Sequence, residues 1–191
     1  MALVMTAAPA TEPISLAEAK AHLRVDATDE DALIGSLISA GRLLVERTMG
    51  LALITQGWSY YLDHWPQSCC ISLPLAPVQA VSAVTLYDAD DAPTVFDAGS
   101  YAVDVMSEPA RSVLQGATPS VATRVFNGFK VAFTAGFGDA AEDVPAPIRH
   151  AVTLLVAHWF ERREPVVLGA GPQEVPATVA GLLQPYRRVR L

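Results

Sequence analysis

Cysteine, aromatic residues and charge are all scarce in this chain of 191 residues. It contains 2 cysteines, 7% aromatic residues and 17% charged residues, although 51% of its residues are hydrophobic. The two cysteines, Cys69 and Cys70, are adjacent, and a disulfide between neighbours would strain the peptide that joins them. Neither lies at a zinc-site spacing from another cysteine or a histidine. We therefore interpret both as free, small apolar side chains, which favours a protein made in the cytoplasm over a disulfide scaffold.

Long hydrophobic runs are also missing. No apolar stretch approaches the roughly 18 residues that a membrane span needs, so we expect no membrane partner. The opening "MALVMTAAPATEP" has no Lys or Arg before its apolar residues and does not resemble a signal peptide. We predict a flexible N-terminus over residues 1–13. Apolar surface in excess of what one core needs then indicates contacts between subunits.

Motifs that carry catalysis or bind cofactors are lacking too. The G-x-G of residues 135–145, "AGFGDAAEDVP", has neither the third glycine of a dinucleotide site nor a G-K-[ST], and it is rich in acidic residues. His150 and His158 are eight residues apart, two helical turns instead of the one turn of a metal-binding helix. Asp63 and His64 form half of a catalytic relay without a recognisable nucleophile. We predict no catalytic, cofactor-binding or metal-binding residue.

The hydrophobic spacing that is present predicts an α+β fold in which a small helical bundle carries an inserted antiparallel β-rich subdomain. Residues 14–50 are predicted to form two helices: Ser15 and Glu18 form a capping box at the first, Thr28 caps the second, and Gly50 ends it. Residues 139–165 read as a long helix with a broad apolar stripe. Residues 166–191 follow as a loop, a short helix and a basic C-terminal arm.

Residues 51–138 change to an alternating pattern, interrupted by turn residues every eight to twelve positions, and we predict a set of short antiparallel strands there. The run "DADDAP" predicts a turn after the strand "AVSAVTLYD". Asn127-Gly128, within "VFNGFKVAFT", is the strongest two-residue hairpin signal in the chain.

Charge is divided unevenly along the chain, whose net charge is −7. The five arginines and three glutamates from Glu161 onward give +2, so the preceding residues carry −9. An acidic body argues against gripping nucleic acid, which needs clustered Lys and Arg. The basic end, "LLQPYRRVRL", combines a tyrosine with forked guanidinium donors, the residue types that dominate contact energy at interfaces. We predict that it is a docking arm made of Leu182, Leu183, Pro185, Tyr186, Arg187, Arg188, Arg190 and Leu191.

The order of these segments resembles that of the head-to-tail connector, or adaptor, proteins of tailed bacteriophages and of the gene transfer agents derived from them. The resemblance runs from "ISLAEAKAHLRVD" and "DALIGSLISAGRLLVERTMG" through "FTAGFGDAAEDVPAPIRHAVTLLVAHWFERREPV" to "LLQPYRRVR". Its most specific part is the strand, the "AGFG" turn, the "VPAPIRHA" helix entry and the "HWFERRE" exit. The region between Ala89 and Val125 is variable and has no residue-by-residue match.

The resemblance implies a structural protein in the neck of a phage or phage-like particle. Such a protein forms a homo-oligomeric ring of about twelve copies beneath the portal protein, and a stopper or tail-terminator protein binds its other side. Double-stranded DNA passes through the ring without specific binding. The basic arm then binds the portal, and the acidic body repels the passing DNA. Two alternatives stay open: a small cytoplasmic enzyme, a hydrolase that uses Asp63 and His64, and a ligand-binding module built on the β-rich part.

Overall fold

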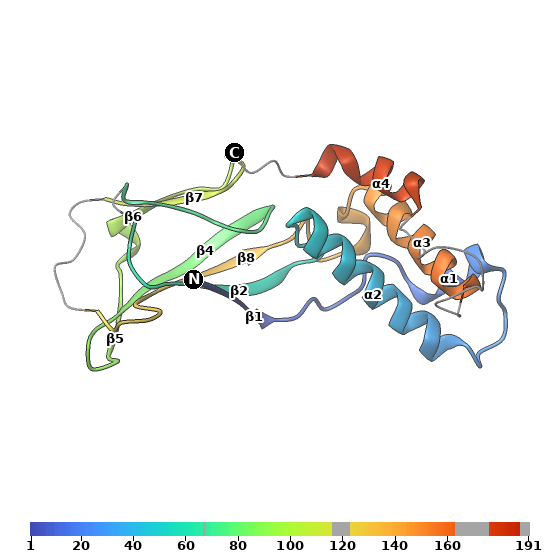
Figure 1. Ribbon diagram of the computed structural model, residues 1–191, viewed down its shortest axis with the longest axis horizontal. Coiled ribbons are helices and arrows are strands. Elements are labelled where there is room, and N and C mark those ends of the chain that lie inside the picture. The colour runs from blue at the N-terminus through green and yellow to red at the C-terminus, as the bar shows by residue number, and fades with distance from the viewer. Residues whose placement is uncertain (67, 116–122, 163–175, 188–191) are drawn as a thin grey trace, which may run out of the picture. The chain divides into compact units, whose positions relative to one another are not determined.

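A computed structural model describes residues 1–66, 68–115, 123–162 and 176–187 (Figure 1). The chain forms two compact units, and it crosses between them three times. Unit 1 comprises Met1–Pro9 and Thr55–Phe137, and unit 2 comprises Ala10–Ile54 and Gly138–Leu191. The strands lie in unit 1 and the described α-helices in unit 2, so the α+β class predicted from the sequence is confirmed.

Unit 1 contains two antiparallel sheets. The larger has the strand order β1-β2-β8-β4-β5, and the smaller has the order β3-β7-β6. Strand β8 is central in the larger sheet, and its residues alternate between buried and half-buried, as expected for a strand with one face on a core. The strands are β1 (Ala2–Ala7), β2 (Gln56–Leu62), β3 (Cys70–Ser72), β4 (Val78–Tyr87), β5 (Pro93–Val95), β6 (Tyr101–Asp104), β7 (Arg111–Leu114) and β8 (Phe129–Ala135). A short 3-10 helix, η1 (Ala98–Ser100), precedes β6.

The core of unit 1 lies under the buried face of β8. Phe129, Val131 and Phe133 are almost fully buried there, together with Val84 of β4. The ring of Trp65 meets that of Phe129 edge-on at a centroid distance of 5.4 Å. Cys69 and Cys70 are half-buried and are not joined in a disulfide; Cys69 directly precedes β3, and Cys70 is its first residue.

Residues 2–7 differ from the flexible terminus predicted for residues 1–13. They form β1, an edge strand that pairs antiparallel with β2, from Ala2 opposite Tyr61 to Ala7 opposite Gly57. No alternation of apolar and polar residues signals this strand, because five of its six residues are exposed and no face is selected for burial. The backbone ladder with β2 holds it.

The turn at Asn127-Gly128 differs from the predicted hairpin. Asn127 does adopt a left-handed conformation, with φ of 56°, but β8 pairs with β2 and β4, and no described strand directly before the turn pairs with it. Instead, the N–H of Asn127 donates to a carboxylate oxygen of Asp63 at 2.9 Å. A Cβ at Gly128 would lie 2.9 Å from the carbonyl oxygen of Asp63, so only glycine fits this approach. A turn therefore forms where the sequence predicted one, but the residue that bonds to it is Asp63, which is distant in sequence.

Unit 2 is a helical bundle of α1 (Leu16–Leu23), α2 (Asp31–Met49), α3 (Ala146–Glu161) and α4 (Ala177–Leu183), with the 3-10 segments η2 (Ala141–Asp143) and η3 (Gln184–Tyr186). The predicted capping box is present, since Ser15 and Glu18 bond each other's backbone N–H. Gly50 ends α2 in a left-handed conformation, also as predicted. Thr28 is not the cap of α2: that helix begins at Asp31, and Thr28 contributes only its carbonyl oxygen, to the N–H of Asp31.

Helices α2 and α3 approach closely at Gly41. A Cβ at this position would lie 3.3 Å from Cγ1 of Val152, whereas a Cβ at Gly35 would meet nothing within 4 Å. Gly41 is therefore the glycine of α2 that allows α3 to pack closely against this helix. The bundle core is formed by Ile34, Ile38 and Val45 of α2, Ile148, Ala151, Val152, Leu155 and Val156 of α3, and Val179 and Leu183 of α4.

Candidate functional site

The predicted docking arm begins on α4, which packs on α3 in the bundle. Val179 and Leu183 are the buried residues of α4, with 0% and 6% of their surface exposed. Leu183 is therefore a core residue of unit 2, although the sequence placed it in the binding arm. Pro185 and Arg187 are exposed, and Leu182 and Tyr186 are half-buried. Arg188, Arg190 and Leu191 lie outside the described residues.

A proline shapes the point at which the arm leaves the bundle. Pro185 cannot donate to the helix ladder, and the chain tightens into η3 directly after α4. The N–H of Arg187 then donates to the carbonyl oxygen of Gln184 at 3.1 Å, and the backbone of Arg187 is extended. The fold thus anchors the arm through Leu183, and the 3-10 turn ends at Arg187.

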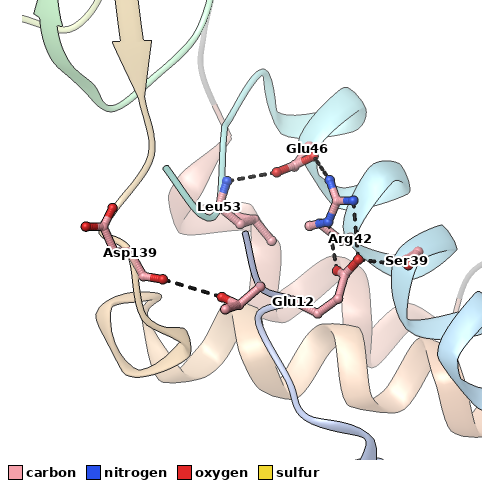
Figure 2. Close-up of polar contacts among 7 residues, drawn as sticks. Glu12, Ser39, Arg42, Glu46, Leu53 and Asp139 are labelled. Atoms are coloured by element: carbon pink, nitrogen blue, oxygen red, sulfur yellow. Dashed lines mark hydrogen bonds and ion pairs between the residues drawn. The ribbon is translucent and has the colours of Figure 1, made fainter. Parts of the chain in front are cut away.

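A buried ionic cluster in unit 2 was not found by reading the sequence. Nε of Arg42 lies 2.8 Å from Glu12, and Nη1 lies 2.9 Å from Glu46, one helical turn farther along α2 (Figure 2). The hydroxyl of Ser39 also donates to Glu12, at 2.8 Å. The other carboxylate oxygen of Glu46 accepts the N–H of Leu53 at 2.9 Å. The only signal was an Arg–Glu pair at i and i+4, which is usually an exposed pair.

The ionic cluster connects three segments that are distant in sequence. It holds Glu12, which precedes α1, and Leu53, which follows α2, to the same side of α2 (Figure 2). Burial alone lowers the pKa of Arg42, but the hydrogen bond with Glu12 and the charges of Glu46 and Glu12 raise it overall. The two carboxylates therefore outweigh the effect of burial on the pKa of Arg42.

A second arginine fixes the same amino-terminal segment to α3. Nε of Arg149 donates to the carbonyl oxygen of Pro13 at 3.0 Å, and Nη2 donates to Glu18 at 2.6 Å. The backbone N–H and hydroxyl of Ser15, with the help of Arg149, lower the pKa of Glu18 below its ordinary value. Residues 12–18 are thus held by α2 on one side and by α3 on the other.

The structure explains why the "AGFG" turn needs its second glycine, Gly138. Oδ2 of Asp143 lies where a Cβ of Gly138 would be, and the same oxygen accepts the N–H of Ala140 at 3.0 Å. A carboxylate of the chain itself therefore accepts a backbone N–H of this turn, whereas a phosphate loop presents its N–H groups to a bound anion. The segment is a turn between a strand and a helix, because β8 precedes it and η2 and then α3 follow it.

Asp63 and His64, the residues of the hydrolase alternative, lie just after β2. The carboxylate of Asp63 accepts the N–H of Asn127, which is the main cause of its lowered pKa, and the chain's amino group lies 3.7 Å from it. This carboxylate holds the turn at Asn127 and lies near the start of β1. Within the described residues, no group of three or more His, Cys, Asp or Glu could hold a metal ion, and no helix is long and apolar enough to cross a membrane.

The family model of head completion proteins matches residues 12–189. The chain belongs to the head completion protein family. A search of curated proteins finds no match. Among solved structures, a chain from the neck of an empty gene transfer agent particle, computed with C6 symmetry, has 30% sequence identity and a TM-score of 0.84. That match covers 100% of this chain and 97% of the other.

Two further structures agree. A chain from the virion of a native gene transfer agent particle has 28% identity and a TM-score of 0.83, with coverage of 100% and 97%. A chain from the neck of the native particle, computed with C12 symmetry, has 29% identity and a TM-score of 0.76, with coverage of 98% and 97%. The family and these matches confirm the resemblance to head-to-tail connectors and a structural role in the neck of a phage-like particle.

Proposed function

We propose that this head completion protein forms a ring of about twelve copies between the portal protein and a stopper or tail-terminator protein, and that DNA passes through the ring. The observation that carries the proposal is the whole-chain similarity to chains of particle necks computed with sixfold and twelvefold symmetry. Cyclic symmetry places identical copies side by side around one axis, with one heterologous contact repeated at every junction.

The basic arm is the part of the chain that binds the portal. Its base is held in place, because Leu183 is buried in the bundle, whereas Pro185 and Arg187, which follow it, are exposed and can contact a partner. Guanidinium groups bind carboxylates through two parallel hydrogen bonds, so an acidic or carbonyl-rich groove on the portal is the expected receptor. Many arms on one ring act together through effective concentration, and modest contacts then give a tight joint.

The acidic body suits a channel for DNA. Residues before Glu161 carry a net charge of −9, and like charge keeps a passing duplex from binding to the wall. The connector needs no catalytic group for this role. The geometry around Asp63 does not favour the hydrolase alternative, since that carboxylate is bonded to the turn at Asn127.

Truncation of the arm tests the proposal. The cut is made after Gln184, because removing Leu183 would open the bundle core instead of testing docking. We expect the shortened chain to keep its helical circular dichroism and to lose binding to portal rings in co-sedimentation. Arg187→Ala should weaken binding in the same direction, whereas Arg47→Ala, an exposed arginine on α2, is the matched control. Unchanged affinity of the truncated chain for the portal would show that the arm is not the docking element.

A further inference from the structure

The first strand of the larger sheet is an unprotected edge. Strand β1 has the sequence ALVMTA, without charge or proline, and apart from the half-buried Leu3 every residue in it is exposed. Its outer side carries backbone N–H and C=O groups that no described strand pairs with. Natural edge strands are usually blunted by lysine, proline or covering segments, because a bare edge readily pairs with another chain. Strand β1 contains neither lysine nor proline, and no described strand covers its outer side.

A second bare edge lies on the opposite side of the same sheet. Strand β5 pairs with β4 only from Thr85 to Tyr87, and Phe96 adds one further hydrogen bond, to Val84. Within the part of the chain that the structure describes, no strand pairs with the outer side of residues 78–83. This stretch equals β1 in length, and β4 also contains no charged residue. The sheet therefore has two free, uncharged edges of matching length.

The strand directions make these two edges compatible. Strands β1, β2, β8 and β4 are antiparallel at each successive pairing, so β1 and β4 run in opposite directions. A rotation around a ring axis places β1 of one copy beside β4 of the next without reversing either strand. The pair so formed is antiparallel, and it continues the hydrogen-bonding pattern of the sheet.

We propose that β1 of each copy pairs with residues 78–83 of β4 in the next copy, so that the larger sheets join into a continuous belt around the ring. The inference rests on the proposed ring. A ring of more than two copies needs a heterologous contact, in which two different patches meet, and β1 and β4 are two different edges. Pairing of β1 with β1 would instead be isologous and would close after two copies.

Disulfide cross-linking in purified particles tests the pairing directly. Cys69 and Cys70 are first changed to serine, so that only introduced cysteines react. Val4→Cys is then combined with Ala80→Cys or with Ser82→Cys, and all three side chains are exposed. Two positions on β4 are tested because the register of β4 against β8 shifts on either side of Val81. Under mild oxidation, we expect one of the double variants to give a ladder of covalent multimers up to the full ring.

Two controls make the result specific. Val4→Cys combined with Met106→Cys, which is 93% exposed in the turn between β6 and β7, should stay monomeric under the same oxidation. The single Val4→Cys variant should also stay monomeric, whereas a covalent dimer would reveal β1–β1 pairing and overturn the proposal. A neck that contains the chain but gives no multimers at either β4 position would overturn it too, and would leave the ring itself standing. Absence of the chain from purified necks would refute the proposed function.

Charge substitutions give a second, independent measurement. Val4→Glu with Ala80→Glu places like charges on both edges, and we expect at least a tenfold loss of particles with the chain in their necks. Val4→Lys with Ala80→Glu places opposite charges there and should restore most of this loss. Equal yields of the two double variants, each folded by circular dichroism, would refute the pairing, because electrostatic complementarity across a seam must distinguish them.

Discussion

Replacing Arg42 by alanine is the sharpest test of how unit 2 is held together. The side chains of Arg42 and Glu46 are each 9% exposed, and that of Glu12 is 30% exposed. The substitution removes the cation beside the buried Glu46, and it leaves Glu12 with the hydrogen bond from Ser39 on α2. Breaking a buried pair by removing one partner costs about 3–5 kcal/mol. Because Glu12 can regain water, we expect the lower end, about 3 kcal/mol of unfolding free energy.

Urea unfolding followed by the helical band of circular dichroism measures this loss. All the described α-helices lie in unit 2, so the signal reports that unit. With a urea slope of about 2 kcal/mol/M, a loss of about 3 kcal/mol lowers the midpoint by about 1.5 M. Glu46→Gln keeps an acceptor for the N–H of Leu53 and leaves Arg42 bonded to Glu12, so about 1–2 kcal/mol should be lost.

Arg47→Ala is the matched control, because Arg47 is an exposed arginine on the same helix. Its stability should change by less than about 0.5 kcal/mol. If Arg42→Ala shifted the midpoint no more than Arg47→Ala, the ionic cluster would not stabilise the unit, and the reasoning from its burial would be refuted.

Two further predictions concern packing and pH. Gly41→Leu should destabilise unit 2 by about 1–3 kcal/mol in the same assay, because α3 leaves no room for a side chain at that position. Gly35→Ala should stabilise the unit by about 0.5–1 kcal/mol, because a Cβ there meets nothing within 4 Å. Equal effects of the two substitutions would contradict the close approach of α3 at Gly41. The N–H and hydroxyl of Ser15 and the charge of Arg149 lower the pKa of Glu18 in the folded state. The ionised Glu18 therefore contributes its full stabilisation of the fold above the unfolded pKa of 4.5, and this contribution is lost as pH falls through the folded pKa. The stability difference between wild type and Glu18→Gln should therefore shrink as pH falls below about 4.5, and a pH-independent difference would refute this linkage.

Local signals in the sequence predicted the elements that depend on nearby residues. The Ser15–Glu18 capping box, the stop at Gly50 and the long helix after Pro145 are set by neighbours within four positions, and the structure has all three. The same reasoning misplaced Asn127-Gly128, because a two-residue turn signal does not say which strand receives the chain afterwards. Here, the deciding partner is Asp63, which is 64 positions away.

The arm shows the same limit at the candidate site. Its composition indicated docking, but composition alone could not separate Leu183, which α3 buries, from Pro185 and Arg187, which remain exposed. Strand β1 was missed for a related reason. An edge strand with hydrophobic side chains on both faces has no periodicity to detect, and only its backbone ladder with β2 defines it.

By itself, the sequence determined the α+β class, the helical segments around a β-rich middle and the family resemblance, since these follow from periodicity, capping residues and motif order along the chain. Only the tertiary structure decided that Arg42 joins Glu12 to Glu46, that Gly41 sets the distance between α2 and α3, and that no described strand pairs with the outer sides of β1 and of residues 78–83. Such features depend on residues far apart in the chain that come together only when the core forms, and no local propensity records them.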